Sequence, residues 1–204
     1  MARRNDHARD ELETLILAAA SRLVEEKGFE GLTARAVAKE IGYAPGTIYN
    51  LFSSMDGLSL ALNARTLEAL AEVLNGPSCH NPDKTPMQNM KAMAQLYYDF
   101  AHDNRGLWLM LFMHRLPEGE KLPDWYQKKI DSLFQPLEEL LQPYYTARQT
   151  QKRKMAARVL WSSVHGLCFL EETGKLPLPD EQTSTFHLGS YLIESFIKGI
   201  QKEG

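Results

Sequence analysis

The stretch AKEIGYAPGTIYNLF (residues 38–52) places a Pro-Gly pair inside a region that otherwise has the residue spacing of helices. Glycine lowers helix propensity by about 1 kcal/mol relative to alanine, and proline has no amide hydrogen to donate. Both are tolerated if one helix ends at Gly42 and another begins near Pro45, because first-turn amides have no intrahelical partner. The stretch therefore predicts two short helices joined by a tight turn, which is the layout of a helix-turn-helix.

The residues before this stretch have the pattern of an amphipathic helix over about 10–27. From Leu12 to Leu23, apolar residues recur at the three- and four-residue spacing of one helical face. Gly28 then fits the end of this helix, and Thr33 fits the N-cap of a short helix that leads into the turn. The N-terminal part of the chain is thus predicted to contain three helices.

The remainder of the chain also divides into helical segments. A long helix is expected over about 54–74, and the three prolines of residues 75–86 mark the loop that follows it. No window alternates polar and apolar residues with the period of a strand. The predicted fold is therefore all-α, with about nine helices. The later helices are expected at about 87–103, 105–115, 124–142, 149–172 and 182–200.

Composition limits the classes to which the protein can belong. Of its 204 residues, 44% are hydrophobic and 24% are charged, which is typical of a globular protein with a packed core. No apolar run approaches the roughly 20 residues that span a bilayer, and the polar N-terminus lacks the apolar stretch of a signal peptide. The two cysteines, Cys79 and Cys168, are expected to be free thiols. We therefore expect a soluble, cytoplasmic protein that does not contact membranes.

The second helix of the predicted pair has an inner and an outer face. Ile48 and Phe52 lie four residues apart and are expected to anchor it on the core. In a helix-turn-helix, the start of this helix enters the major groove of DNA. A generic helical hairpin has the same spacing, so the spacing alone leaves both interpretations open. The outward residues are Tyr43, Thr47, Tyr49 and Asn50, and positive charge comes from Arg35 and from the N-terminal arginines Arg3, Arg4 and Arg9.

Residues 28–62, GFEGLTARAVAKEIGYAPGTIYNLFSSMDGLSLAL, resemble the DNA-binding domain of the TetR family of transcriptional regulators. A shorter segment, WSSVHGL (residues 161–167), is similar to the Trp-x-x-x-His-Gly signature of one C-terminal subgroup of that family. The positions that match the DNA-binding pattern are Gly28, Phe29, Thr33, Ala38, Gly42, Gly46, Thr47, Ile48, Tyr49 and Phe52.

This resemblance implies an N-terminal three-helix DNA-binding domain over residues 1–55. It also implies a C-terminal helical bundle over residues 56–204 that binds a ligand and forms a dimer. The expected function is that of a repressor, not an enzyme, which binds a pseudo-palindromic operator in double-stranded DNA as a homodimer and is released by a small molecule. The expected DNA-binding residues are Arg3, Arg4, Thr33, Arg35, Tyr43, Ala44, Pro45, Gly46, Thr47, Tyr49 and Asn50.

Two positions depart from the pattern of the family. Met55 stands where the family usually has a lysine that touches a phosphate. Ala44 stands where many members have a serine, so a side-chain cap of about 1 kcal/mol is missing. Residues 1–55 also contain seven Lys and Arg against eight Asp and Glu. We therefore expect modest affinity for DNA with a strong dependence on salt.

The middle helices are rich in methionine and aromatic residues. Each of these side chains taken singly fits an ordinary core, but together they suit an apolar cavity, because methionine repacks around ligands of different shape. A mostly apolar small molecule is therefore the expected effector. The candidate ligand-binding residues are Met93, Tyr97, Trp108, Phe112, Phe134, Trp161 and His165.

The last two long helices are expected to form the dimer interface. Residues 159–170 are apolar on most faces, which indicates burial on more than one side. Residues 186–200 also distribute apolar side chains around much of a helix. By resemblance, these helices pair with their copies in a second subunit as a four-helix bundle. The candidate interface residues are Trp161, Leu167, Tyr191, Phe196 and Ile200.

Other chemistry has little support in the sequence. His165 and Cys168 are three residues apart on one helical face, but two ligands do not make a metal site. The chain has no glycine-rich phosphate-binding motif and no readable catalytic set, so no cofactor and no metal is expected. The alternative that remains is an all-α enzyme or small-molecule carrier with a vestigial helix-turn-helix, which the departure at Met55 keeps open.

Overall fold

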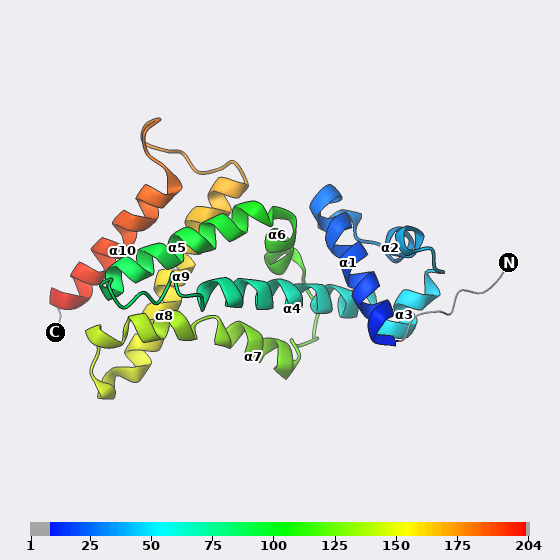
Figure 1. Ribbon diagram of the computed structural model, residues 1–204, viewed down its shortest axis with the longest axis horizontal. Helices are drawn as coiled ribbons and strands as arrows, with labels where there is room; N and C mark the ends of the chain where they lie inside the picture. Colours follow the sequence, from blue (N-terminus) through cyan, green and yellow to red (C-terminus); the bar gives the residue numbers. More distant parts are fainter. Residues whose placement is uncertain (1–8, 203–204) are drawn as a thin grey trace. The chain divides into compact units, whose positions relative to one another are not determined.

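A computed structural model describes residues 9–202 of the chain (Figure 1). In these residues every regular element is helical, which confirms the all-α fold. Arg3 and Arg4, two of the predicted DNA contacts, lie outside the described residues. The α-helices are α1 (Arg9–Lys27), α2 (Ala34–Ile41), α3 (Gly46–Phe52), α4 (Met55–Leu74), α5 (Pro86–Asp103), α6 (Arg105–Met113), α7 (Asp124–Ser132), α8 (Gln135–Leu140), α9 (Thr150–Glu172) and α10 (Thr185–Lys202). Three short 3-10 helices are η1 (Phe29–Gly31), η2 (Gln142–Tyr144) and η3 (Ala147–Gln149).

The predicted helix over 124–142 is interrupted. Its first half is α7 and its second half is α8, with a turn at Leu133 and Phe134 between them. In this turn the amide of Leu133 donates to the carbonyl of Ile130, a bond that spans three residues instead of four. Pro136 then has no amide to donate, which fits the first turn of a new helix better than the interior of a continuous one.

The chain forms two compact units. Unit 1 contains the described residues up to Thr66 together with Asn104–Tyr126, and unit 2 contains Leu67–Asp103 together with the described residues from Gln127 onward. One boundary falls inside α4. These units group residues by packing, whereas the division at residues 55 and 56 is a functional one, and that division stays a prediction.

Unit 1 is built around α1. This helix packs against α2, η1 and α6, and α2 packs against α3. Its core contains fully buried side chains from α1, α2, α3, the start of α4, and α6. These side chains are Ile16, Val37, Ile48, Leu58 and Met110. The packing holds α2 and α3 as a fixed pair at the N-terminal end of the chain (Figure 1).

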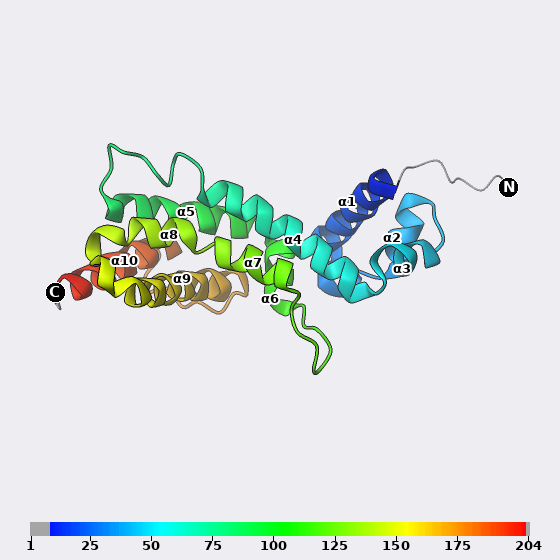
Figure 2. The same cartoon turned by 90° about the horizontal axis from the view of Figure 1, so that it is seen from below.

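Unit 2 is a bundle in which α5 is central. This helix packs against α8, α9 and α10, and α9 also packs against α8 and α10 (Figure 2). Met90 on α5, Leu160 on α9 and Ile193 on α10 are almost completely buried between these helices. Their burial supplies an apolar interior, and that interior contains the cavity described below.

Candidate DNA-binding site and ligand cavity

The turn between α2 and α3 has the geometry that its sequence predicts. Thr33 caps α2, because its Oγ1 accepts a hydrogen bond from the amide of Ala36 at 3.1 Å. Gly42 ends the helix with φ 75° and ψ 28°, in the left-handed region where a side chain is costly. The amide of Tyr43 donates to the carbonyl of Ala38 at 2.9 Å and closes the turn.

Helix α3 begins at Gly46, the second residue of the Pro-Gly pair. Pro45 occupies the N-cap with φ −55°, and the carbonyl of Ala44 accepts from the amide of Thr47 at 2.9 Å. No side chain caps this helix, as expected from alanine at position 44. Gly46 is the first residue of α3, and a Cβ added there would have no other atom within 4 Å. The start of α3 therefore presents little more than backbone to its surroundings.

The two faces of α3 differ in exposure. Ile48 is 0% exposed and Phe52 packs against the core of unit 1, so both anchor the helix as predicted. Tyr49 is 48% exposed and Asn50 is exposed as well. Tyr43 and Thr47 are only half-buried, so they are less open than an outward position implies. Ala44, Pro45 and Gly46 are exposed and continue this outer surface.

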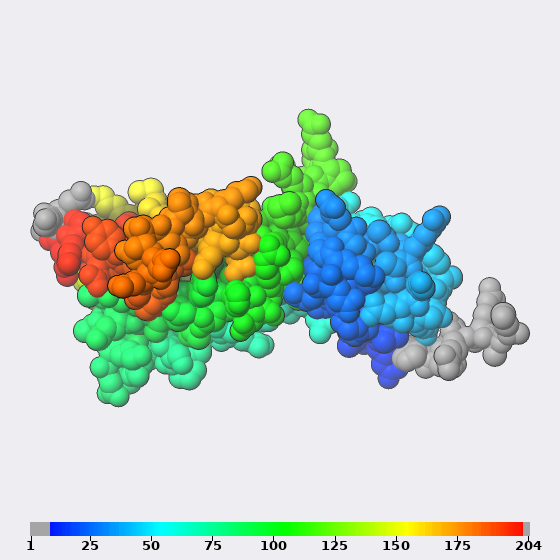
Figure 3. All heavy atoms as spheres, turned by 90° about the horizontal axis from the view of Figure 1, so that it is seen from above, coloured from blue at the N-terminus to red at the C-terminus, as the bar shows by residue number. Residues whose placement is uncertain are grey.

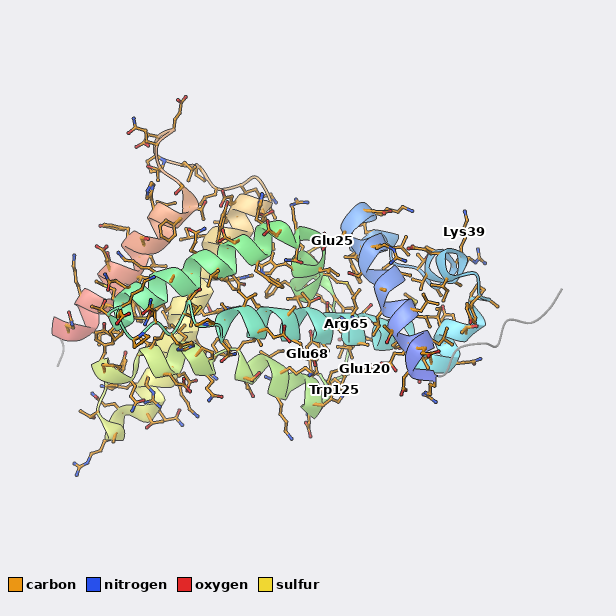
Figure 4. All side chains as sticks on the ribbon, in the orientation of Figure 1. Glu25, Lys39, Arg65, Glu68, Glu120 and Trp125 are labelled. Atoms are coloured by element: carbon orange, nitrogen blue, oxygen red, sulfur yellow. The ribbon has the colours of Figure 1, made fainter. Side chains whose placement is uncertain are left out.

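Helix α2 adds positive charge beside this surface. Arg35 is exposed, and Lys39 lies one turn further along the same helix and is also exposed (Figure 4). Lys39 was not among the predicted DNA-binding residues, although its four-residue spacing from Arg35 places both on one helical face. Glu40 is paired with Arg22 at 2.7 Å, which offsets its negative charge locally.

The packing of Met55 accounts for the departure from the family pattern at this position. It is the first residue of α4, and its side chain is half-buried against the core of unit 1. The cap of α4 is Ser54, whose Oγ accepts from the amide of Gly57 at 3.0 Å. Position 55 thus contributes apolar packing where a lysine would contribute a phosphate contact.

Helix α6 is attached to unit 1 near both of its ends. The carboxylate of Glu25 on α1 accepts hydrogen bonds from the amides of Gly106 at 3.3 Å and Leu107 at 3.2 Å (Figure 4). Directly after the helix, His114 Nε2 lies 2.9 Å from Asp56 Oδ1 in the first turn of α4. These contacts join α1, α4 and α6 within unit 1.

Unit 2 contains an apolar cavity of about 40 Å³. Three of the seven predicted ligand-binding residues, Met93, Tyr97 and Trp161, line it. The other lining residues are mostly aliphatic and come from α4, α5, the turn before α8, α8, α9 and α10. They are Leu74, Met90, Ala94, Leu133, Leu137, Leu160, Val164 and Ile193.

His165 and Phe134 do not line this cavity, but they pack against two residues that do, Tyr97 and Trp161. The hydroxyl of Tyr97 lies 2.9 Å from Nδ1 of His165, whose ring stacks on Trp161 with centroids 5.0 Å apart. The rings of Phe134 and Trp161 pack edge to face, with their centroids 5.4 Å apart. Burial lowers the pKa of His165 and therefore favours the neutral imidazole.

Trp108 and Phe112 lie on α6 in unit 1 and are not among the lining residues of the cavity. Their rings contact each other edge to face at 5.2 Å, and Trp108 is 0% exposed. The apolar spacing of α6 was compatible with either a cavity wall or a core, and the sequence did not distinguish them.

The residues predicted for the dimer interface differ widely in exposure. Tyr191 on α10 is 73% exposed, whereas Leu167, Phe196 and Ile200 are half-buried and Trp161 faces the cavity. Figure 3 shows α10 and the loop before it on the surface of unit 2. Helix α9 exposes three further apolar side chains that were not among the candidate interface residues, although two of them lie in the predicted segment 159–170. They are Met155 (62%), Val159 (53%) and Leu170 (39%).

Two family descriptions match the chain, and both concern one family. "Bacterial regulatory proteins, tetR family" matches residues 16–62, which contain the α2–turn–α3 unit. "Tetracyclin repressor-like, C-terminal domain" matches residues 90–190. The chain belongs to the TetR family of transcriptional regulators. As a TetR-family regulator it binds DNA and is not an enzyme, so the enzyme alternative is removed.

One curated protein is related to the chain in sequence, and several solved structures share its fold. The chain is 25% identical over 159 residues to an uncharacterised helix-turn-helix transcriptional regulator of Mycobacterium tuberculosis, covering 78% of this chain and 69% of that protein. Its fold is similar to that of a protein of unknown function from Rhodococcus sp. RHA1, with a TM-score of 0.73, 17% identity, and coverage of 97% and 98% of the two chains. It is also similar to the multidrug binding protein EbrR complexed with imidazole, with a TM-score of 0.65, 19% identity, and coverage of 94% and 96%.

Two further findings concern residues 9–202. No helix in this range is both long enough and apolar enough to cross a bilayer. Within the same range, no three His, Cys, Asp or Glu side chains gather as they do around a metal ion. Of the pair considered for metal binding, His165 lies 2.9 Å from the hydroxyl of Tyr97, and Cys168 is buried.

Proposed function

We propose that this TetR-family regulator is a cytoplasmic repressor that binds a pseudo-palindromic operator as a homodimer and is released by a small, mostly apolar effector. The observation that carries the proposal is the two-faced helix α3. Ile48 is 0% exposed and fixes the helix on unit 1, while the next residue, Tyr49, points away from this core and is 48% exposed. A helix anchored in this way presents a rigid outer surface of the size that enters a major groove.

The outer residues divide by the chemistry that they offer to DNA. Thr47 and Asn50 carry groups able to hydrogen-bond base edges, and Tyr43 and Tyr49 carry hydroxyls that suit phosphate oxygens. Arg35 and Lys39 on α2 add two exposed cations beside them. Thr33 contributes by capping α2, and Ala44, Pro45 and Gly46 allow the backbone to come close to the DNA.

A homodimer supplies two such surfaces, which match the two halves of a pseudo-palindromic operator. The exposed apolar residues of α9 and α10 in unit 2 support this part of the proposal, because apolar side chains that gather on a surface mark sites of protein interaction, and Met155 and Val159 share one face of α9. Leu167, Phe196 and Ile200 are half-buried on the same two helices.

The effector is proposed to bind at the cavity of unit 2. Its volume of about 40 Å³ is far below the roughly 300 Å³ of a typical ligand site. A ligand can therefore enter only if the surrounding helices and the side chains of Met90 and Met93 rearrange. This requirement gives the ligand a different affinity for the two states of unit 2, which is the condition for it to shift an equilibrium.

A footprinting experiment on the DNA upstream of the protein's own gene tests the proposal. Two protected patches about one helical turn apart, or a whole number of turns apart, are expected. They should appear together as protein concentration rises, because one dimer covers both. A single protected patch, or uniform protection of all sequences, would contradict binding of a dimer to a two-fold operator.

A further inference from the structure

A second, smaller cavity of about 10 Å³ adjoins the first one in unit 2. It lies among α5, α9 and α10, and two residues, Ala94 and Val164, line both cavities. The small side chain of Ala94 and the glycine at position 189 leave space along this path. The two cavities together form one elongated, mostly apolar space, and Tyr98 and Thr185 bring polar groups to its smaller end.

Two polar atoms without hydrogen-bond partners lie at the far end of this path or directly behind its wall. Thr185 lines the smaller cavity and is 4% exposed, and its Oγ1 has no partner in the described part of the chain. Tyr98 also lines this cavity, and its hydroxyl donates to Oε1 of Glu171 at 3.1 Å. Glu171 therefore lies directly behind the lining residue Tyr98, and the second oxygen of its carboxylate, Oε2, is buried and has no partner among residues 9–202. Leaving such atoms unpaired is costly, so they indicate a missing donor.

The surroundings of Glu171 are negatively charged. Burial, followed by the charges of Glu171 and Glu172, raises the pKa of Tyr98 to about 12. Burial, with Glu171 and Glu172 again, raises the pKa of Cys168 to about 12. Glu172 lies 3.2 Å from Nδ1 of His102, whereas the described residues include no lysine or arginine paired with Glu171. A cation is therefore the group that would balance this end of the path.

We propose that the effector carries one protonated amine on an apolar body, and that the amine binds at Glu171, Tyr98 and Thr185. The ammonium donates to Oε2 of Glu171 and to Oγ1 of Thr185, which satisfies both orphaned oxygens. The apolar body passes between Ala94 and Val164 into the larger cavity, where it contacts Met93 and Trp161. This inference rests on the proposed function, since it specifies the chemical class of the effector that unit 2 binds.

Three probes that share one apolar body test this assignment. They are 4-phenylbutylamine, 4-phenylbutanol and 4-phenylbutyrate, which carry a cationic, a neutral and an anionic head. Calorimetric titration of the full chain should show the amine binding about tenfold or more tightly than the alcohol, because its hydrogen bonds to the carboxylate are charge-assisted. The butyrate should bind most weakly, since its charge repels Glu171 and Glu172.

The variant Glu171→Gln keeps the size of the side chain and an oxygen that can accept from Tyr98. It should bind the amine no more than about twofold more tightly than the alcohol, while its affinity for the alcohol stays at the wild-type value. Glu181→Gln is the matched control, because Glu181 is an exposed glutamate of the loop before α10 and lies outside both cavities. It should keep the full preference for the amine, and thermal melts of both variants establish that they are folded.

Equal affinity for amine and alcohol in the wild type would overturn the inference, and so would a preference for the amine that persists in Glu171→Gln. Absence of binding by the amine would also overturn it and would leave a buried water as the partner of Thr185. These outcomes are separate from the proposed function. If the alcohol releases DNA without any selectivity for the head group, the repressor stands and the assignment of the amine fails.

Discussion

Two glycines differ in the reason for which they lack a side chain. The fold requires glycine at one position, and DNA binding is proposed to require it at the other. A Cβ at Gly106 would lie 2.7 Å from the carbonyl oxygen of Val24, so α6 can approach α1 only because this residue has no side chain. A Cβ at Gly46 would meet nothing within 4 Å, and the backbone of Gly46 is helical. The chain itself therefore does not require glycine at position 46.

The variants Gly46→Ala and Gly106→Ala should consequently behave in opposite ways. Gly46→Ala should be as stable as the wild type or more stable by about 0.5–1 kcal/mol, yet bind DNA more weakly because its methyl group faces the phosphates. Gly106→Ala should lose about 1–3 kcal/mol through overpacking. Urea unfolding and DNA titration of both variants measure these effects. Full DNA affinity in Gly46→Ala would show that the start of α3 does not come close to DNA.

His165 makes the stability of unit 2 depend on pH. Burial lowers its pKa in the folded state, so the unfolded chain takes up the proton at a higher pH than the folded chain does. The stabilisation is therefore complete above the ordinary histidine pKa of about 6.5 and is lost as the pH falls below it. Urea unfolding at about pH 7.5 and about pH 5.5 should show a smaller loss for His165→Gln than for the wild type. An equal loss in both proteins would assign the acid sensitivity to other groups.

The structural roles of several of these residues could be predicted, because they depend on residues nearby in the sequence. Thr33, Gly42 and Ile48 each act through neighbours a few positions away, and capping, turn and periodicity rules describe such short distances. Glu25 was not predictable in this way, because the amides that it binds are 81 and 82 positions away in the sequence. The unpaired oxygens of Glu171 and Thr185 likewise emerge only from the packing of α5, α9 and α10.

Among the elements, α6 depends on α1 for its first turn. The carboxylate of Glu25 accepts from two amides that would otherwise lack partners, and its charge is favourable at a helix N-terminus. Glu25→Ala should therefore cost about 1 kcal/mol of unfolding free energy. Glu26→Ala is the control, since Glu26 is exposed and accepts no bond from α6 in the described structure. An equal effect of the two substitutions would show that the contact with α6 does not contribute.

The helices themselves were largely predictable, whereas their partners were not. The apolar spacing and the Pro and Gly punctuation placed every predicted segment within a few residues of a helix. The exception is 124–142, where a turn at Leu133 and Phe134 divides α7 from α8. Trp108 and Phe112 were assigned to the ligand site because an apolar helical face does not reveal what it packs against. Their membership of unit 1 could be read only from the three-dimensional contacts.

For the whole molecule, the proposed dimer depends on exposed apolar residues of α9 and α10. Val159→Asp places a charge on this surface and should convert the dimer to a monomer at micromolar concentration. Ala69→Asp, an exposed position of α4, is the matched control and should remain a dimer. Sedimentation velocity measures both. A dimer that persists in Val159→Asp, or a wild type that sediments as a monomer, would refute this interface.

The measurement that most directly tests the central claim is the binding of upstream DNA by wild type and by the double variant Thr47→Ala/Tyr49→Ala. Fluorescence anisotropy at about 150 mM salt should show tighter binding by the wild type to this DNA than to a scrambled duplex. The double variant should lose that preference while keeping the wild-type circular dichroism spectrum and melting temperature. Undiminished, sequence-selective binding by a folded double variant would contradict the claim that α3 reads the operator.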